Sequence, residues 1–169
     1  VMNYDGAKAY LLGEENGGLD IMFKLMNTAR LGTALQGLAM SEASFQGALP
    51  YARERLQMRS LTGPKNPDGE ADPIIVHPDV RRMLMTQKAL TEGSRAFIYW
   101  LSYLVDKTRY GSEEDAKNAD DLLGLLTPIA KAFCTEAAQE VTSLGLQVFG
   151  GHGYIAEHGM EQIVRDTRI

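Results

Sequence analysis

The chain has 169 residues, of which 44% are hydrophobic and 23% are charged, a length and composition that fit one domain with its own core. Its 17 Lys and Arg residues and 22 Asp and Glu residues leave a net charge of -5. This is the wrong sign for a protein that gains affinity by neutralising phosphates, so we expect no nucleic-acid partner.

No apolar run is long enough to cross a bilayer, and we expect neither a membrane span nor a secretion signal. The chain opens on Val1 and stops at Ile169, directly after a helix-like segment, so we expect a fragment of a longer protein. A single cysteine, Cys134, has no partner for an internal disulfide, and its neighbours predict a small buried side chain on a helix.

Residues 1–18 read as a short strand followed by a glycine-rich turn, and we assign them to the end of an upstream β-domain. Residues 19–169 form the next domain. Over residues 19–55, leucines and other apolar residues recur at helical spacing, and Pro50 is the only proline. This pattern predicts one long helix, or two nearly collinear helices divided near Pro50.

Residues 60–76 hold three prolines and two glycines, which predicts a loop longer than most helix connections; loops of this kind are usually functional or disordered. Pro78 and Asp79 suit the first turn of a second helix, which should run to about residue 107. After a polar connection over 110–120, we expect a third helix over 119–149.

A fourth, short helix begins near residue 161. Three long helices and a short one, with few strand signals, predict an all-α fold. We expect an antiparallel helical bundle packed on a short strand remnant at the N-terminus.

The histidines His77, His152 and His158 stand at no metal-ligand spacing with Cys or carboxylates, so we expect no metal site. A glycine turn over 150–153 follows the third helix. Its glycines permit positive φ and leave backbone N–H groups uncovered, which suits contact with a phosphate or a flat ring. A helix C-terminal cap requires glycine there too, and the two interpretations are compatible.

Arg53, Arg55 and Arg59 surround Gln57 at the end of the first helix, where they complement the helix dipole or bind an anionic ligand. Arg30 lies inside an otherwise apolar helix. A charge in that setting needs a partner, which is either a carboxylate of the fold or a phosphate of a ligand.

Five motifs, taken in order, resemble the C-terminal half of the acyl-CoA dehydrogenases. They are Gly13-Glu-Glu-Asn-Gly-Gly18, Asn27-Thr-Ala-Arg30, Tyr51-Ala-Arg-Glu-Arg-Leu-Gln57, Gln147-Val-Phe-Gly-Gly-His-Gly-Tyr154 and Arg165-Asp-Thr-Arg-Ile169. The resemblance covers essentially the whole chain. Within the family, the chain is most similar to the long-chain-like branch that contains the methylmercaptopropionyl-CoA dehydrogenases.

The resemblance implies FAD as cofactor and an acyl-CoA as substrate. Arg55 and Gln57 match the motif with which one subunit holds the FAD of its neighbour, and the glycine turn matches the contact with the adenosine of that FAD. The turn residues are Gln147, Val148, Phe149, Gly150 and Gly151. Asn27 and Arg30 align with the segment that faces the acyl-CoA. Pro78 replaces a glutamine that helps to hold FAD in many relatives, so that contact is expected to be lost.

Relatives remove the α proton with a glutamate that follows the Arg-Asp-x-Arg-Ile motif, so we expect the base beyond Ile169 and no catalytic residue in this chain. Neither Glu157 nor Glu161 matches it, and the fragment alone should be inactive. The resemblance further implies a homodimer or homotetramer, electron-transfer flavoprotein as acceptor, and a bacterial cytoplasmic or mitochondrial matrix location. Alternatives are an acyl-CoA oxidase, a flavin monooxygenase, or a non-catalytic dimerisation bundle.

Overall fold

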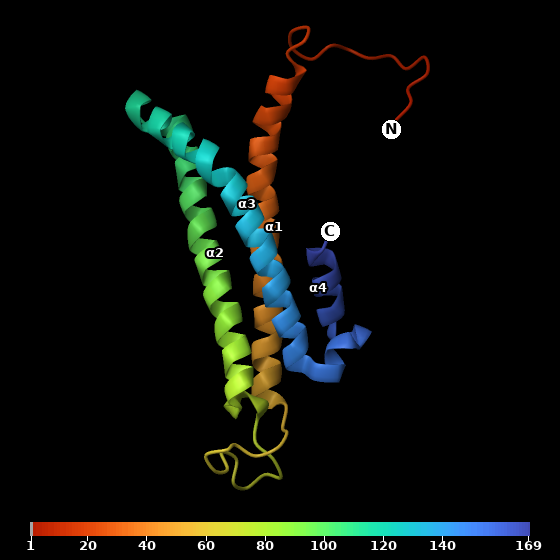
Figure 1. Cartoon of the computed structure of the whole chain (residues 1–169), viewed down its shortest axis with the longest axis vertical. Coiled ribbons are helices and arrows are strands. Elements are labelled where there is room, and N and C mark those ends of the chain that lie inside the picture. Colours follow the sequence, from red (N-terminus) through yellow and green to blue (C-terminus); the bar gives the residue numbers. More distant parts are fainter. Residues whose placement is uncertain (1) are drawn as a thin grey trace.

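The structure is a computed structural model that describes residues 2–169. Four α-helices dominate that range: α1 (Gly18–Glu54), α2 (Pro78–Tyr110), α3 (Glu113–Phe149) and α4 (Met160–Thr167). Helices α1, α2 and α3 run up and down beside one another, and α4 folds back along α1 and α3 (Figure 1). The predicted all-α bundle is confirmed. None of the described helices is both long enough and apolar enough to span a membrane.

Helix α1 passes through Pro50 without a break, so the single-helix interpretation is correct. A proline inside a helix leaves the carbonyl four residues earlier without its N–H partner. Here that carbonyl belongs to Gln46, and both Gln46 and Pro50 lie on the exposed side of the helix. Water can therefore satisfy the unpaired carbonyl, and the helix continues to Glu54.

The connection between α2 and α3 is much shorter than the sequence predicted, because the polar stretch after residue 112 is the start of α3. The Ser112 hydroxyl accepts a hydrogen bond from the Asp115 N–H at 3.2 Å and caps the helix. Acidic residues in the first turn favour the positive end of the helix dipole. Lys107 on α2 also contacts the Asp115 carboxylate at 2.9 Å. The polar and acidic residues that suggested a loop are therefore the residues that begin helix α3.

The predicted N-terminal strand is not formed. Residues 2–17 contain neither helix nor strand, and nearly all of them are exposed. A strand needs a neighbouring strand to satisfy its backbone groups, and the only pairing of this kind within the described residues is an isolated bridge between Leu56 and Pro73. The segment extends away from the bundle at the top of Figure 1.

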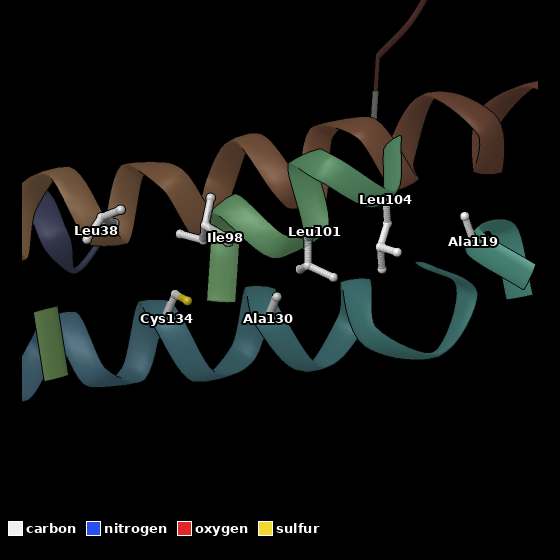
Figure 2. Close-up of a cluster of buried hydrophobic side chains, with 8 residues drawn as sticks. Leu38, Ile98, Leu101, Leu104, Ala119, Ala130 and Cys134 are labelled. Atoms are coloured by element: carbon white, nitrogen blue, oxygen red, sulfur yellow. The ribbon is translucent and has the colours of Figure 1, made fainter. Parts of the chain in front are cut away.

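The core consists of two apolar clusters stacked along the bundle. The upper cluster comprises Ala34, Leu38, Ile98, Leu101, Leu104, Ala119, Ala130 and Cys134 (Figure 2). The lower cluster comprises Ala48, Ala52, Ile74, Met83, Leu84, Val148, Phe149 and Met160. Cys134 is completely buried in the upper cluster, which confirms its interpretation as a small core residue, and this burial raises the pKa of its thiol. The lower cluster ends where the C-termini of α1 and α3 meet, and it supports the pocket described below.

The loop between α1 and α2 folds around one buried carboxylate. Asp72 is 0% exposed. Its side chain accepts hydrogen bonds from the N–H groups of Ser60 at 2.8 Å, Lys65 at 2.8 Å and Asn66 at 2.7 Å, and from Arg59 at 3.4 Å. The Ser60 N–H lowers the pKa of Asp72 most and the other donors add to it, against the opposing effect of burial, so that the pKa falls from 3.8 to about 2.

Helices α1 and α3 approach closely at Gly37. A Cβ atom added there would lie 2.7 Å from the Cys134 carbonyl oxygen of α3. The obstacle is backbone, which cannot rotate away as a side chain can. The glycine therefore sets the spacing of the two helices.

We predict that Gly37→Ala destabilises the protein by about 1–3 kcal/mol through this clash. Gly32→Ala is the matched control, because Gly32 is on the same helix with nothing within 4 Å of its added Cβ, and alanine favours helix there by up to about 1 kcal/mol. The free energies of unfolding in urea measure both effects. Equal effects of the two substitutions would contradict the close approach.

The lowered pKa of Asp72 predicts a pH-dependent contribution to stability. Since its folded-state pKa lies below the unfolded value of 3.8, the contribution is complete above that value and disappears as the pH falls through about 2. The unfolding free energies of wild type and Asp72→Asn, measured from pH 7 to pH 2, should therefore converge in the acid range. A constant difference between them across this range would refute the assignment.

Candidate functional site

A pocket of about 700 Å³ opens at the lower end of the bundle, where α1 and α3 end and the α1–α2 loop folds back. It brings together all the residues that the sequence predicted to hold a cofactor: Arg55, Gln57, Gln147, Val148, Phe149, Gly150 and Gly151. The remaining lining residues are Tyr51, Met58, Ile74, His77, Val80, Met83, His152 and Ile155. Segments distant in sequence thus line one pocket, and the segment after α1 forms one of its walls.

The end of α1 places Arg55 and Gln57 in this wall. Arg55 is the first residue after the helix, and its N–H donates to the Tyr51 carbonyl at 2.8 Å. The chain then extends, so Leu56 forms an antiparallel bridge with Pro73. The side chains of Arg55 and Gln57 are exposed and line the pocket. The short extended segment after α1 thus presents the two polar side chains that the sequence predicted to contact a cofactor.

The glycine turn forms the opposite wall as the 3-10 helix η2 (Gly150–Tyr154). Gly150 has φ 58 and ψ -135, which only glycine adopts readily, and its N–H donates to the Gln147 carbonyl, so the cap interpretation is confirmed. An added Cβ at Gly153 would lie 2.6 Å from the Leu146 carbonyl oxygen. Gly151 has neither constraint, because its φ is ordinary and nothing lies within 4 Å of an added Cβ. The open space at Gly151 fits a ligand that approaches the backbone.

Tyr51 fixes the glycine turn from the α1 side, a role that the sequence did not reveal. Its ring stacks on Phe149 with centroids 4.0 Å apart. Its hydroxyl lies 3.4 Å from the Phe149 carbonyl oxygen and 3.1 Å from Nδ1 of His152. The spacing in the sequence could have indicated this role, because Tyr51 precedes Arg55 by about one helical turn and so points toward the same side of the bundle.

The pocket carries the positive charge of Arg55, and no Asp or Glu lines it. His77 and His152 add polar ring nitrogens. Arg55 forms no ion pair within residues 2–169. His77 does not cap α2 with its side chain; its Nε2–H donates to the Gln57 carbonyl at 2.9 Å. A free guanidinium beside apolar side chains suits an anionic ligand that also carries a flat ring.

Asn27 and Arg30 lie apart from this pocket, farther toward the N-terminus of α1. Arg30 donates to the Asn27 side-chain oxygen at 3.3 Å and pairs with no carboxylate in the described part of the chain. Arg30 precedes Gly37 by about two helical turns, so both occupy one face of α1. Gly37 lines a second pocket of about 580 Å³. Arg30 therefore continues the face of α1 at Gly37, whereas Asn27 is placed only by its hydrogen bond to Arg30, and neither residue lines the second pocket.

The second pocket lies between α1, α3 and the end of α4. It is lined by Thr33, Gln36, Gly37, Met40, Lys131, Thr135, Glu136, Gln139, Asp166, Thr167, Arg168 and Ile169. Arg168 donates to Gln139 at 3.4 Å and joins α4 to α3. Neither Glu157 nor Glu161 lines either pocket. Within residues 2–169, no group of three or more His, Cys, Asp or Glu side chains is arranged to hold a metal ion.

Known proteins share the sequence pattern and the fold of this chain. The sequence profile described as "Acyl-CoA dehydrogenase, C-terminal domain" matches residues 16–169. A 3-methylmercaptopropionyl-CoA dehydrogenase of Ruegeria pomeroyi is 48% identical over 169 residues, which cover 100% of this chain and 28% of the relative. The chain thus spans under a third of the length of that curated relative.

Solved structures give the same result. Butyryl-CoA dehydrogenase from Megasphaera elsdenii matches with a TM-score of 0.71 and 25% identity, over 92% of this chain and 34% of the other. A structure described as the electron transferring flavoprotein of Acidaminococcus fermentans matches with a TM-score of 0.73 and 25% identity, over 93% and 35%. The bundle is therefore shared with these proteins.

The contrast between Gly151 and Gly153 gives a direct test of the pocket. If the pocket holds the FAD that the sequence resemblance implies, Gly151→Ala should leave the melting temperature unchanged but weaken FAD binding roughly tenfold, because the added methyl group occupies ligand space. Gly153→Ala should destabilise the protein by about 1–3 kcal/mol through its clash with Leu146. Thermal unfolding and FAD titration of both variants separate the effects. Unaltered FAD affinity in Gly151→Ala would mean that no ligand approaches this turn.

Proposed function

Because the chain belongs to the acyl-CoA dehydrogenase family, whose C-terminal domain it matches over residues 16–169, we propose that it is the helical C-terminal domain of an FAD-dependent acyl-CoA dehydrogenase. The whole protein oxidises the Cα–Cβ bond of an acyl-CoA thioester to the 2-enoyl-CoA. When bound, the flavin supplies the hydride acceptor. The observation that carries this proposal is the single pocket that unites the predicted cofactor residues.

The residues present fit FAD in charge and in shape. Arg55 offers a guanidinium with no internal ion pair, which suits a pyrophosphate, and Gln57 adds an amide beside it. The open backbone at Gly150 and Gly151, next to the buried Phe149 ring, suits the adenosine. In the proposal, these residues bind and orient the cofactor and take no part in proton transfer.

We assign Asn27 and Arg30 to the acyl-CoA. Arg30 has no carboxylate partner among the described residues, which favours the ligand alternative for its charge. It continues the face of α1 that lines the second pocket. We place the base that removes the α proton beyond Ile169, where the resemblance of the Arg165–Ile169 motif to the family puts it; Glu157 and Glu161 line neither pocket.

We also propose that the domain functions in a homodimer or homotetramer, in which Arg55 and Gln57 contact the FAD of the neighbouring subunit. Large apolar side chains on the outer faces of α2 and α3 support a contact between subunits. They include Tyr99, Trp100, Tyr103, Leu125, Ile129 and Phe133. Electron-transfer flavoprotein is the proposed acceptor of the electrons, and light scattering of the whole protein tests the assembly.

The reaction is tested with the full-length protein, FAD, an acyl-CoA and an artificial electron acceptor. The proposal predicts formation of 2-enoyl-CoA with reduction of the acceptor, and bleaching of the flavin when the acceptor is left out. Fast reoxidation of the reduced flavin by oxygen would favour an oxidase or a monooxygenase. Flavin absorbance that does not change on adding FAD to the protein would favour a non-catalytic dimerisation bundle.

We predict that Arg55→Ala weakens FAD binding by roughly 10- to 100-fold, the effect of losing a hydrogen bond to a charged group. Arg53→Ala is the matched control, because Arg53 is exposed in the last turn of α1 and does not line the pocket. Flavin content of the purified full-length variants gives the result. Wild-type flavin content in Arg55→Ala would contradict the cofactor site.

A further inference from the structure

The α1–α2 loop is joined to the cofactor wall through its most buried residue. The N–H of Gln57 donates to the Asp72 carbonyl at 2.9 Å, and the N–H of Asp72 donates to the Met58 carbonyl at 2.9 Å. The N–H of Ile74 donates to the Arg55 carbonyl at 2.8 Å. The wall therefore has its backbone partners in the segment around Asp72.

The wall needs this support, because no helix holds it. Helix α1 ends at Glu54, and residues 55–58 are exposed. Met58 adopts φ 61, the left-handed region that a non-glycine residue occupies at a cost of about 1 kcal/mol or more. Left to itself, the segment would relax to other conformations. The loop selects the conformation that lines the pocket.

The side chain of Asp72 orders the loop that supplies this support. It accepts N–H groups from Ser60, early in the loop, and from Lys65 and Asn66 in the middle of the loop. Arg59 completes the arrangement, because its guanidinium donates to the carbonyls of Asn66 and Gly69 and to Asp72. Arg59 is therefore committed to the loop and is not a cation of the pocket.

Asp72 itself does not line the pocket and is completely buried. We propose that Asp72 is a positioning residue of the cofactor site: its carboxylate fixes the loop, and through backbone pairing the loop holds Gln57 and Met58 where the cofactor contacts them. The inference rests on the proposed FAD site and deepens it. It makes the long loop a determinant of cofactor retention.

The test uses Asp72→Asn in the full-length holoenzyme. The amide keeps the shape of the carboxylate but replaces one acceptor oxygen with a donor, which then faces a backbone N–H. We expect the dissociation constant of FAD to rise roughly tenfold, as expected for loss of one charge-assisted hydrogen bond. Asp68→Asn is the matched control, because Asp68 is an exposed carboxylate in the same loop and should retain wild-type affinity.

Hydrogen exchange separates positioning from general destabilisation. In Asp72→Asn, the Gln57 amide should exchange faster, while amides in the middle of α1 and α3 keep their protection. The KM for acyl-CoA should stay at the wild-type value in the flavin-saturated enzyme. If Asp72→Asn does not fold, Arg59→Ala is used instead, because it removes the partly exposed guanidinium that bonds to Asp72 and to the loop carbonyls. We then expect a smaller rise in the FAD dissociation constant and a smaller increase in Gln57 amide exchange.

Arg55→Ala serves as the reference for the outcomes. Loss of FAD in both Arg55→Ala and Asp72→Asn, with faster exchange at Gln57, supports the inference. Loss in Arg55→Ala alone overturns it and leaves the cofactor site intact. Wild-type FAD affinity in both variants overturns the proposed function as well.

Discussion

The candidate site depends on two helices that end side by side. Tyr51, in the last turns of α1, stacks on Phe149 at the end of α3 with ring centroids 4.0 Å apart. The same tyrosine hydroxyl lies near the Phe149 carbonyl and His152. Since Arg55 follows one helix and Gly150 the other, this contact brings a cation and an open backbone turn together. The close approach at Gly37 keeps the two helices in contact higher in the bundle.

Charge is distributed unevenly between the cofactor pocket and the rest of the protein. The chain carries a net charge of -5, yet no carboxylate lines the cofactor pocket. The acidic residues nearest in sequence serve other purposes, as Asp72 does when it accepts backbone N–H groups inside the loop. A negative protein thereby maintains a local site for an anion, because none of its carboxylates lines this pocket.

The sequence predicted the helices, because helical periodicity is a local property, and the residues that it assigned to the cofactor lie together in one pocket. Its errors have local causes too: the acidic stretch before residue 119 is a capped helix start rather than a loop, and residues 2–17 meet no pairing strand within the described part of the chain. Tyr51, His77 and His152 were missed because their roles depend on contacts between distant segments. The path of the loop around Asp72 depends on hydrogen bonds that composition does not encode.

A structure of the full-length protein with FAD bound tests the central claim most directly. The account predicts that the FAD pyrophosphate lies within hydrogen-bond distance of Arg55 and Gln57, and that its adenosine lies against Gly150 and Gly151 at the end of α3. FAD held entirely by other parts of the protein, with this pocket filled by protein or water, would contradict the account.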